Sequence, residues 1–257
     1  MGEGKLRVLD LFSGIGGFSL GLERTGGFET VAFCEIEEFP RRVLAKHWPG
    51  VPIYDDVRTL TGARLAADGI AVDVITGGFP CQDLSSAGQQ LGISGQRSGL
   101  WGEIARLASE LRPQYVLVEN VANLLAGERG AWFGRVLGDL AAIGYDAEWH
   151  CIPASAVGAP HSRERVWIVA YPQEGVRDRV LFSGKIHDEG LAEGFKRIWA
   201  VIRARRARGA PPADFGRLRK DDGLSARLGE VIAYGNTVVP QIPELIGRAI
   251  LQTEAAA

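Results

Sequence analysis

The feature that most constrains the fold is a series of short apolar runs, each followed within two residues by glycine or an acidic residue. The runs occupy residues 5–12, 28–34, 51–54, 72–76 and 114–118. Apolar runs of this length, bounded by turn residues, are typical of buried strands. Segments with helical spacing lie between them at 18–23 and 99–111, and a further one lies at 132–143. Alternating strands and helices predict an α/β protein with a mostly parallel sheet.

A glycine-rich turn, Ser13-Gly14-Ile15-Gly16-Gly17, connects the first run to the first helix. This is the first half of a nucleotide-binding unit, in which glycines let a ligand reach the backbone at the helix N-terminus. Similar turns also occur without ligands. Glu35 follows Gly17 by 18 residues, close to the ~20 expected for a carboxylate that binds ribose hydroxyls.

Acidic residues lie at or just after the carboxyl ends of three successive predicted strands, at Asp10, Glu35 and Asp56. Any one of them alone is more readily a helix cap or a solvated turn residue. Together they predict a pocket at one edge of the sheet for a ligand with an adenosine part.

A cysteine lies on a stiff loop, Gly77-Gly78-Phe79-Pro80-Cys81-Gln82, after the run at 72–76. The carboxyl end of a strand is where open α/β sheets place their ligands, so the thiol is a candidate nucleophile. A buried structural cysteine is the alternative interpretation. We interpret the glycine-rich residues 82–98 as a lid over a substrate.

Charged residues follow two further runs. Glu119-Asn120-Val121 comes after the run at 114–118, and a carboxylate leaving a buried strand would have a raised pKa and act as an acid. A helix-capping Glu-Asn pair is the alternative. Residues 145–152 and 165–171 predict two paired strands. Arg163 and Arg165, two apart on extended chain, would point the same way and grip an anion or a carboxylate. We interpret His161 as a hydrogen-bonding loop residue.

Composition excludes some classes of protein. The 257 residues are 46% hydrophobic, and the three cysteines, Cys34, Cys81 and Cys151, form no C-x-x-C pair. We therefore expect no metal site, no disulfide framework and a reducing cytoplasm. No apolar run is long enough to span a bilayer and no signal peptide is recognised, so we expect no membrane partner. The net charge is −2, but residues 196–220 carry nine Lys/Arg and one acid. This run is either a solvated face or a contact for a phosphate backbone.

Taken together, these motifs resemble those of the DNA cytosine-5 methyltransferases of bacteria and phages. The match covers five stretches in the family's order: the residues 10–17, 78–82, 119–121, 163–166 and 235–240. The resemblance implies a Rossmann-like S-adenosylmethionine-dependent methyltransferase fold with a mostly parallel seven-stranded sheet. It also implies three parts: a catalytic and cofactor-binding domain (1–171), a small, mostly irregular target-recognition region (172–230), and a C-terminal segment (231–257) that returns to the first domain.

The same resemblance implies roles for individual residues in catalysis. Cys81 would add to C6 of a cytosine flipped out of double-stranded DNA. Glu119 would protonate N3, and Arg163 and Arg165 would hold the base O2 and orient Glu119. Contacts to DNA would come from Gln82, Ser85, Arg203, Arg205 and Arg206.

The resemblance further implies S-adenosyl-L-methionine as cofactor and S-adenosyl-L-homocysteine as product. The methionine end would lie against Phe12 and the glycine turn, and the ribose against Glu35. The adenine would lie against Ile36, Asp56 and Val57, and the sulfonium region would be enclosed by Pro80, Leu100 and Asn236. The implied cofactor-binding set is Phe12, Gly14, Gly16, Gly17, Glu35, Ile36, Asp56, Val57, Pro80, Leu100 and Asn236.

Two departures from the family pattern concern target choice. The gap between the arginine motif and the final loop is short, and Asp55 stands where the family often has glycine. A catalytically silent DNA-binding or regulatory module of the same fold is therefore one alternative, and a tRNA cytosine-5 methyltransferase is another. A nicotinamide dehydrogenase would leave the Cys81 and Glu119 loops unexplained. We expect a monomeric enzyme in the cytoplasm of a bacterial cell or a phage-infected host.

Overall fold

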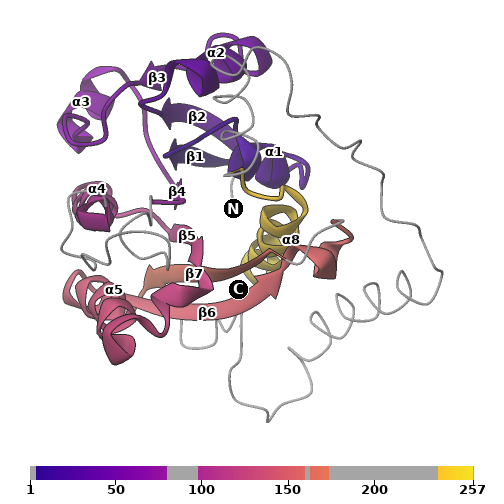
Figure 1. Ribbon diagram of the computed structural model, residues 1–257. Helices are drawn as coiled ribbons and strands as arrows, with labels where there is room; N and C mark the ends of the chain where they lie inside the picture. Colours follow the sequence, from indigo (N-terminus) through magenta and orange to yellow (C-terminus); the bar gives the residue numbers. More distant parts are fainter. Residues whose placement is uncertain (1–3, 80–97, 160–162, 174–236, 257) are drawn as a thin grey trace, which may run out of the picture.

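The computed structural model describes residues 4–79, 98–159, 163–173 and 237–256. Within these ranges the chain forms one sheet with helices on both faces (Figure 1). The strands are β1 (Leu6–Leu11), β2 (Phe28–Cys34), β3 (Ile53–Tyr54), β4 (Val74–Gly77), β5 (Tyr115–Val121), β6 (Tyr145–Pro153) and β7 (Glu164–Pro172). The α-helices are α1 (Gly17–Glu23), α2 (Glu38–His47), α3 (Gly62–Ala67), α4 (Trp101–Leu111), α5 (Ala131–Ala142) and α8 (Gln241–Ala256). Short 3-10 segments are η1 (Ser98–Leu100), η2 (Ala122–Leu124), η3 (Gly127–Gly130) and η4 (Ala154–Val157).

The seven strands follow the order β3-β2-β1-β4-β5-β7-β6. The first five in this order are parallel, whereas β7 is antiparallel to both of its neighbours. The predicted α/β class and mostly parallel seven-stranded sheet are therefore confirmed. The strand order reverses between β1 and β4, and in open α/β sheets ligands bind outside the carboxyl ends of the strands at such a point. The glycine turn after β1 and the loop after β4 both leave the sheet there.

The two faces of the sheet bury separate hydrophobic clusters. Side chains of β1 alternate between them: Val8 belongs to one cluster, and Leu9 and Leu11 to the other. Strand side chains point alternately to opposite faces, so helices are needed on both. Helices α1 and α8 cover the Val8 face, whereas α3, α4 and α5 cover the other (Figure 1).

The C-terminal helix α8 returns to the first part of the chain, as the resemblance implied. It packs against α1, where a Cβ at Gly21 would collide with the carbonyl oxygen of Pro240. Ile242, Ile246 and Ile250 enter the same cluster as Phe28. The C-terminal segment therefore forms a helix that continues to Ala256. The division of the chain at 171 and 230 stays a prediction because residues 174–236 lie outside the described ranges.

Strand β5 is longer than its apolar run. Pairing with β7 continues through Glu119 (opposite Trp167), Asn120, and Val121 (opposite Arg165). The apolar pattern ends at Val118 because the next two residues are polar, yet their backbone still belongs to the sheet. Glu119 and Asn120 are therefore strand residues, and the helix-capping alternative is wrong.

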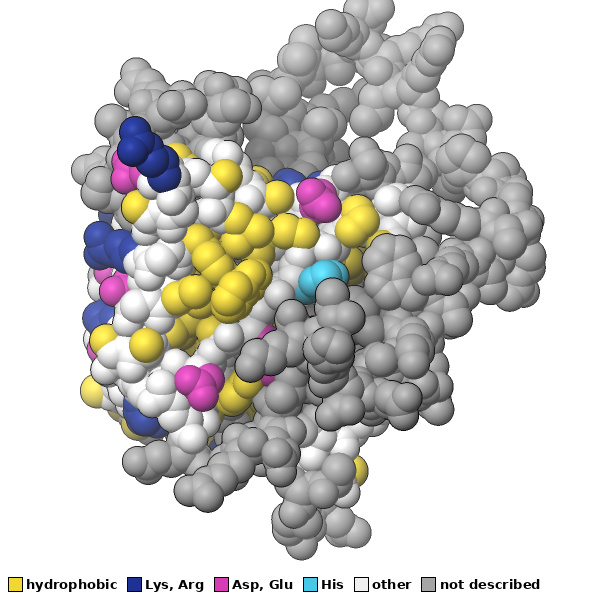
Figure 2. Space-filling model, turned by 90° about the horizontal axis from the view of Figure 1, so that it is seen from below, with side chains coloured by type: hydrophobic (Ala, Val, Ile, Leu, Met, Phe, Trp, Pro, Cys, Tyr) yellow, Lys and Arg dark blue, Asp and Glu magenta, His cyan; other side chains and the backbone are white. Residues whose placement is uncertain are grey.

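One described surface is apolar. Seen from below, hydrophobic side chains gather on the side formed by β6 and α5 (Figure 2). Trp149 of β6 is 44% exposed, and its ring lies edge-on to Phe133 of α5 at 4.9 Å between centroids. Among the described residues, no helix combines the length and hydrophobicity needed to cross a bilayer.

Candidate active site

A buried glutamate, Glu119, forms ion pairs with two arginines at the end of β5. The Glu119 side chain is 9% exposed, and its Oε1 lies 3.1 Å from Nε of Arg165 and 3.7 Å from Nη2 of Arg163. The antiparallel register places Arg165 opposite Val121, two residues along from Glu119 on the same face of the sheet. The prediction that the two arginines point the same way and grip a carboxylate is confirmed.

Burial raises the pKa of Glu119, although the positive charges of Arg163 and Arg165 act in the opposite direction. A carboxyl group with a raised pKa can hold a proton closer to neutral pH. The adjacent guanidinium groups stabilise its ionised form after the proton has left. The arrangement is therefore suited to donating a proton to a polar ligand atom and taking it back.

The residue beside Glu119 fixes the start of the cysteine loop. Asn120 is 2% exposed, and its Nδ2 donates to the carbonyl oxygen of Phe79 at 3.1 Å. Its Oδ1 accepts a hydrogen bond from the Val121 amide at 2.8 Å. A Cβ at Gly78, which follows β4, would lie 3.3 Å from Oε2 of Glu119, so a larger residue there would crowd this carboxylate. Sequence reasoning did not assign Asn120 to the site, although its place beside Glu119 was the available signal.

Several predicted site residues lie outside the described ranges. They are Pro80, Cys81, Gln82, Ser85, Arg203, Arg205, Arg206 and Asn236, together with His161. Their roles stay predictions. Of the two described cysteines, Cys34 is buried at the end of β2, and burial raises the pKa of its thiol to about 12. Cys34 therefore stays protonated and unreactive at neutral pH.

Backbone strain and a buried carboxylate meet at the glycine turn after β1. Phe12 has φ +52°, a left-handed conformation that an aromatic residue rarely adopts. The Gly14 amide donates to Oε2 of Glu35 at 2.7 Å, and the Glu37 amide donates to Oε1 at 2.8 Å. Burial raises the pKa of Glu35, partly offset by these two bonds. The predicted juxtaposition of the turn with Glu35 is therefore present, and the carboxylate is fixed in place by backbone donors.

The three glycines of the turn have different surroundings. A Cβ at Gly16 would lie 2.5 Å from the Trp48 ring, and one at Gly17 would lie 2.5 Å from the carbonyl oxygen of Val238. Packing of the protein against itself accounts for glycine at these two positions. Gly14 has φ +52°, and a Cβ there would meet no atom of the described residues within 4 Å. Within the described part of the chain, Gly14 is therefore the glycine of the turn beside which a ligand has room to approach the backbone.

The residues predicted to contact adenine lie at the ends of β2 and β3. Ile36 is 59% exposed, an unusual position for a large apolar side chain next to a buried glutamate. Val57 is 5% exposed. The Asp56 carboxylate accepts hydrogen bonds from the Arg58 guanidinium, which lower the Asp56 pKa. Leu100 ends η1 and is half-buried against the core cluster.

The expectation that Asp10 lines a pocket with Glu35 and Asp56 is wrong. Asp10 is fully buried under α1, where it accepts hydrogen bonds from Ser19 Oγ at 2.8 Å and Thr76 Oγ1 at 2.7 Å. The side chain points to the α1 face because Asp10 alternates with Leu9 and Leu11 along β1. It therefore connects β1, β4 and α1 from within. No cluster of three metal-ligating side chains occurs among the described residues.

The sheet order, the glycine turn with its buried glutamate and the antiparallel final strand pair define the class of the protein. The fold is the Rossmann-like fold of the S-adenosylmethionine-dependent methyltransferases. A family model for the C-5 cytosine-specific DNA methylases matches residues 6–192, and the chain belongs to this family.

Individual relatives agree with this assignment. The Type II methyltransferase M2.BsuMI of Bacillus subtilis is 37% identical over 193 residues, which cover 74% of this chain and 47% of the relative. Type II methyltransferase M1.ScrFI of Lactococcus lactis subsp. cremoris is 33% identical, covering 67% of this chain and 43% of the relative. The chain thus spans about half the length of these curated relatives.

A solved structure, that of the S. pombe Dnmt2 methyltransferase, superimposes with a TM-score of 0.61. The match covers 97% of this chain and 99% of that chain at 17% identity. At this identity the likeness supports the fold alone.

Proposed function

We propose that this chain transfers a methyl group from S-adenosylmethionine to C5 of a cytosine in double-stranded DNA. The observation that carries the proposal is the buried Glu119 carboxylate, held by Arg163 and Arg165 beside the first residues of the cysteine loop. A planar base with one ring nitrogen, an amino group and a carbonyl offers complementary atoms to such a cluster. The family to which the chain belongs supports cytosine as that base.

The chemical difficulty is that C5 of cytosine is a weak nucleophile. In the proposed reaction the Cys81 thiolate forms a bond to C6, which makes C5 electron-rich. S-Adenosylmethionine, when bound, supplies the electrophilic methyl group that C5 attacks. The C5 proton is then lost to a base, the C6–S bond breaks, and Cys81 leaves as thiolate. Cys81 can reach C6 only if the cytosine has left the base stack.

Glu119 would act on the opposite side of the ring. As the thiolate adds to C6, negative charge develops at N3, and Glu119 would donate a proton there. Its raised pKa supports this role, because burial favours the protonated carboxyl group. Arg163 and Arg165 would hold the base O2 and stabilise the Glu119 carboxylate once the proton has left. Elimination of Cys81 returns the proton from N3.

The residues around the glycine turn fit S-adenosylmethionine. Open space in front of Gly14 leaves room for the methionine part against the backbone. Glu35 is held at the end of β2 with both oxygens oriented, so its remaining lone pairs can accept ribose hydroxyls. The exposed Ile36 side chain offers an apolar face to adenine, and Asp56 with Val57 would contact the adenine edge.

The test is transfer of labelled methyl from S-adenosylmethionine to mixed-sequence duplex DNA, with base-resolution mapping of the product. The full chain is compared with Cys81→Ser and with Cys151→Ser as the matched control. We expect 5-methylcytosine at one short site with the wild type and Cys151→Ser, and none with Cys81→Ser. Methyl transfer by Cys81→Ser at the wild-type rate would overturn the nucleophile. Methylation of RNA but not DNA would overturn the proposed substrate, and cofactor binding without any transfer would indicate a silent module.

A further inference from the structure

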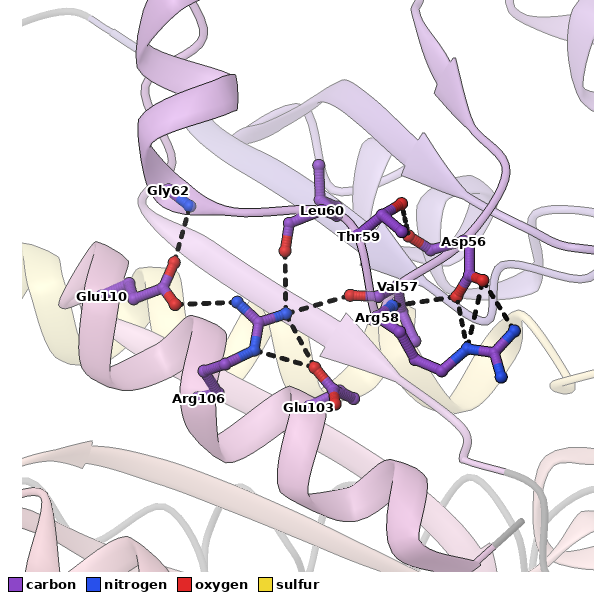
Figure 3. Close-up of polar contacts among 9 residues, drawn as sticks. All are labelled: Asp56, Val57, Arg58, Thr59, Leu60, Gly62, Glu103, Arg106 and Glu110. Carbon is purple, nitrogen blue, oxygen red and sulfur yellow. Dashed lines mark hydrogen bonds and ion pairs between the residues drawn. The ribbon is translucent and has the colours of Figure 1, made fainter. Parts of the chain in front are cut away.

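The Arg106 guanidinium joins α4 to the loop that follows β3 (Figure 3). Its Nη2 donates to the carbonyl oxygen of Val57 at 3.0 Å and to that of Leu60 at 2.8 Å. Its Nε donates to Glu103 at 2.8 Å and its Nη1 donates to Glu110 at 2.7 Å. All three nitrogens of one side chain are therefore engaged, and two of the acceptors belong to a loop more than 40 residues earlier.

Glu110 extends the same contact to the next helix. Its second oxygen, Oε2, accepts from the Gly62 amide at 2.7 Å, at the first residue of α3. The loop is closed from within by the Leu60 amide, which donates to the carbonyl oxygen of Asp56 at 3.2 Å. Helix α4 thus holds the loop at Val57, Leu60 and Gly62 through backbone groups, in addition to the burial of the Val57 and Leu60 side chains in the core.

Stabilising α4 alone does not explain this geometry. Arg106 forms ion pairs with Glu103 and Glu110, but their side chains are 26% and 34% exposed. Ion pairs this exposed contribute little to stability. Charge-assisted bonds to two carbonyl oxygens require the fixed fork of an arginine and hold two groups in one geometry. The Arg106 guanidinium therefore orients the loop that contains Val57 and Leu60.

We propose that Arg106 is a positioning residue for the adenine end of the cofactor site. By holding the Val57 and Leu60 carbonyls it positions the backbone that carries Val57 and Asp56, the two residues that would contact the adenine edge, while Arg58 orients the Asp56 carboxylate. The inference rests on the proposed function and deepens it, because it assigns recognition of the adenine base to a residue on α4, outside the loop that makes the contact.

The experiment measures how well the full chain distinguishes two product ligands by calorimetry. S-Adenosylhomocysteine carries the adenine amino group, and S-inosylhomocysteine has an oxo group in its place. We expect the wild type to prefer the first. In Arg106→Lys, which keeps the charge and loses the fork, we expect the ratio of the two affinities to fall about tenfold, the equivalent of one charge-assisted hydrogen bond.

Two further variants isolate the effect. Arg135→Lys is the matched control, because Arg135 makes an i,i+4 ion pair with Asp139 on α5. Its affinity ratio should equal that of the wild type. Glu110→Ala removes the Gly62 contact from a partly exposed position and should lower the ratio in the same direction, which keeps the test available if Arg106→Lys does not fold.

The outcomes separate the inference from the proposed function. Equal loss of both affinities, or an unchanged ratio in Arg106→Lys and Glu110→Ala, would overturn the positioning role while leaving methyl transfer intact. Failure of the wild type to bind either ligand would overturn the cofactor proposal itself, and the inference with it.

Discussion

Nε of Arg165 on β7 lies 3.1 Å from Oε1 of Glu119 on the antiparallel neighbour β5, and the Glu119 side chain is only 9% exposed. Burial raises the pKa of Glu119, and the positive charges of Arg163 and Arg165 act against that rise. This environment supports the proposed role of Glu119 as a proton donor.

Replacing the Glu119 carboxyl group tests its proposed role as a proton donor. Glu119→Gln keeps the shape of the side chain but cannot deliver a proton, so methyl transfer should slow by about 10²–10³-fold. The affinity for S-adenosylmethionine should remain within about twofold, because the cofactor residues lie elsewhere. Single-turnover rates and calorimetry measure the two effects. Glu148→Gln on β6, where Glu148 accepts from the Tyr171 hydroxyl, is the matched control, and an equal loss of rate in both variants would contradict the acid role.

Asn120 gives a second prediction, about the loop that carries Cys81. Asn120→Ala removes the hydrogen bond to the Phe79 carbonyl oxygen, two residues before the cysteine. Loss of a buried hydrogen bond typically costs about 1–3 kcal/mol, which here would loosen the backbone at Phe79. We expect the rate of methyl transfer to fall about tenfold or more while the affinity for cofactor stays constant.

The Asn120 prediction needs a variant that lowers stability without touching the loop. Thr25→Ala removes the Thr25 hydroxyl, which donates to the Leu22 carbonyl oxygen at the end of α1. If rates in Asn120→Ala and Thr25→Ala fall in proportion to their melting temperatures, the hydrogen bond to Phe79 has no specific part in catalysis.

Much of the fold could be predicted because the apolar runs report burial directly. The run at 28–34 coincides with β2, and the paired strands expected at 145–152 and 165–171 correspond to β6 and β7. Predicted bounds failed where polar residues belong to the sheet, as in β5. Local propensity carries no information about a strand neighbour such as β7, which supplies the pairing for Glu119 and Asn120.

The candidate site was only partly predictable for the same reason. The spacing of Arg163 and Arg165 on extended chain predicted that they would grip a carboxylate together, whereas their pairing with Glu119 was implied by the family resemblance. Asp10 was misassigned because an acid at a strand end looks the same in sequence whether it faces a ligand or a helix. Arg106 was missed because its acceptors are backbone carbonyls of a remote loop, which leave no mark in the sequence.

The glycine turn gives a third prediction, in which two similar substitutions have different effects. Gly17→Ala places a Cβ 2.5 Å from the Val238 carbonyl oxygen, so it should lower the melting temperature by forcing α8 and its preceding loop away from α1. The Cβ of Gly14→Ala meets no atom of the described residues, but the substitution restricts a backbone with φ +52° and fills the space in front of the turn. It should cost about 1 kcal/mol of stability and weaken S-adenosylmethionine binding by more than tenfold.

Thermal unfolding and calorimetry on both variants decide this prediction. We expect Gly17→Ala to lower the melting temperature more than Gly14→Ala does. We expect Gly14→Ala to weaken cofactor binding by more than its loss of stability explains. Unchanged cofactor affinity in a folded Gly14→Ala variant would show that the open space beside Gly14 is not where the cofactor binds.

Asp10 gives a prediction for the pH dependence of stability. Burial raises its pKa from 3.8 to about 7, despite hydrogen bonds from Thr76 and Ser19. The folded protein therefore binds a proton at Asp10 that the unfolded chain has lost between these two values. The contribution of this group to stability is fully present below pH ~4 and is lost as the pH rises through 7. A shift of this size corresponds to roughly 4 kcal/mol.

Asp10→Asn removes the titration while keeping the shape and the ability to pair with both hydroxyls. From pH 5 to pH 8 the wild type should lose free energy of unfolding relative to the variant, and most of the change should fall between pH 5 and 7. Urea unfolding at several pH values measures the difference, and Asp55→Asn, at an exposed acid, is the control. A difference between wild type and Asp10→Asn that does not vary with pH would mean that Asp10 is ionised throughout, held by Ser19 and Thr76 strongly enough to outweigh its burial.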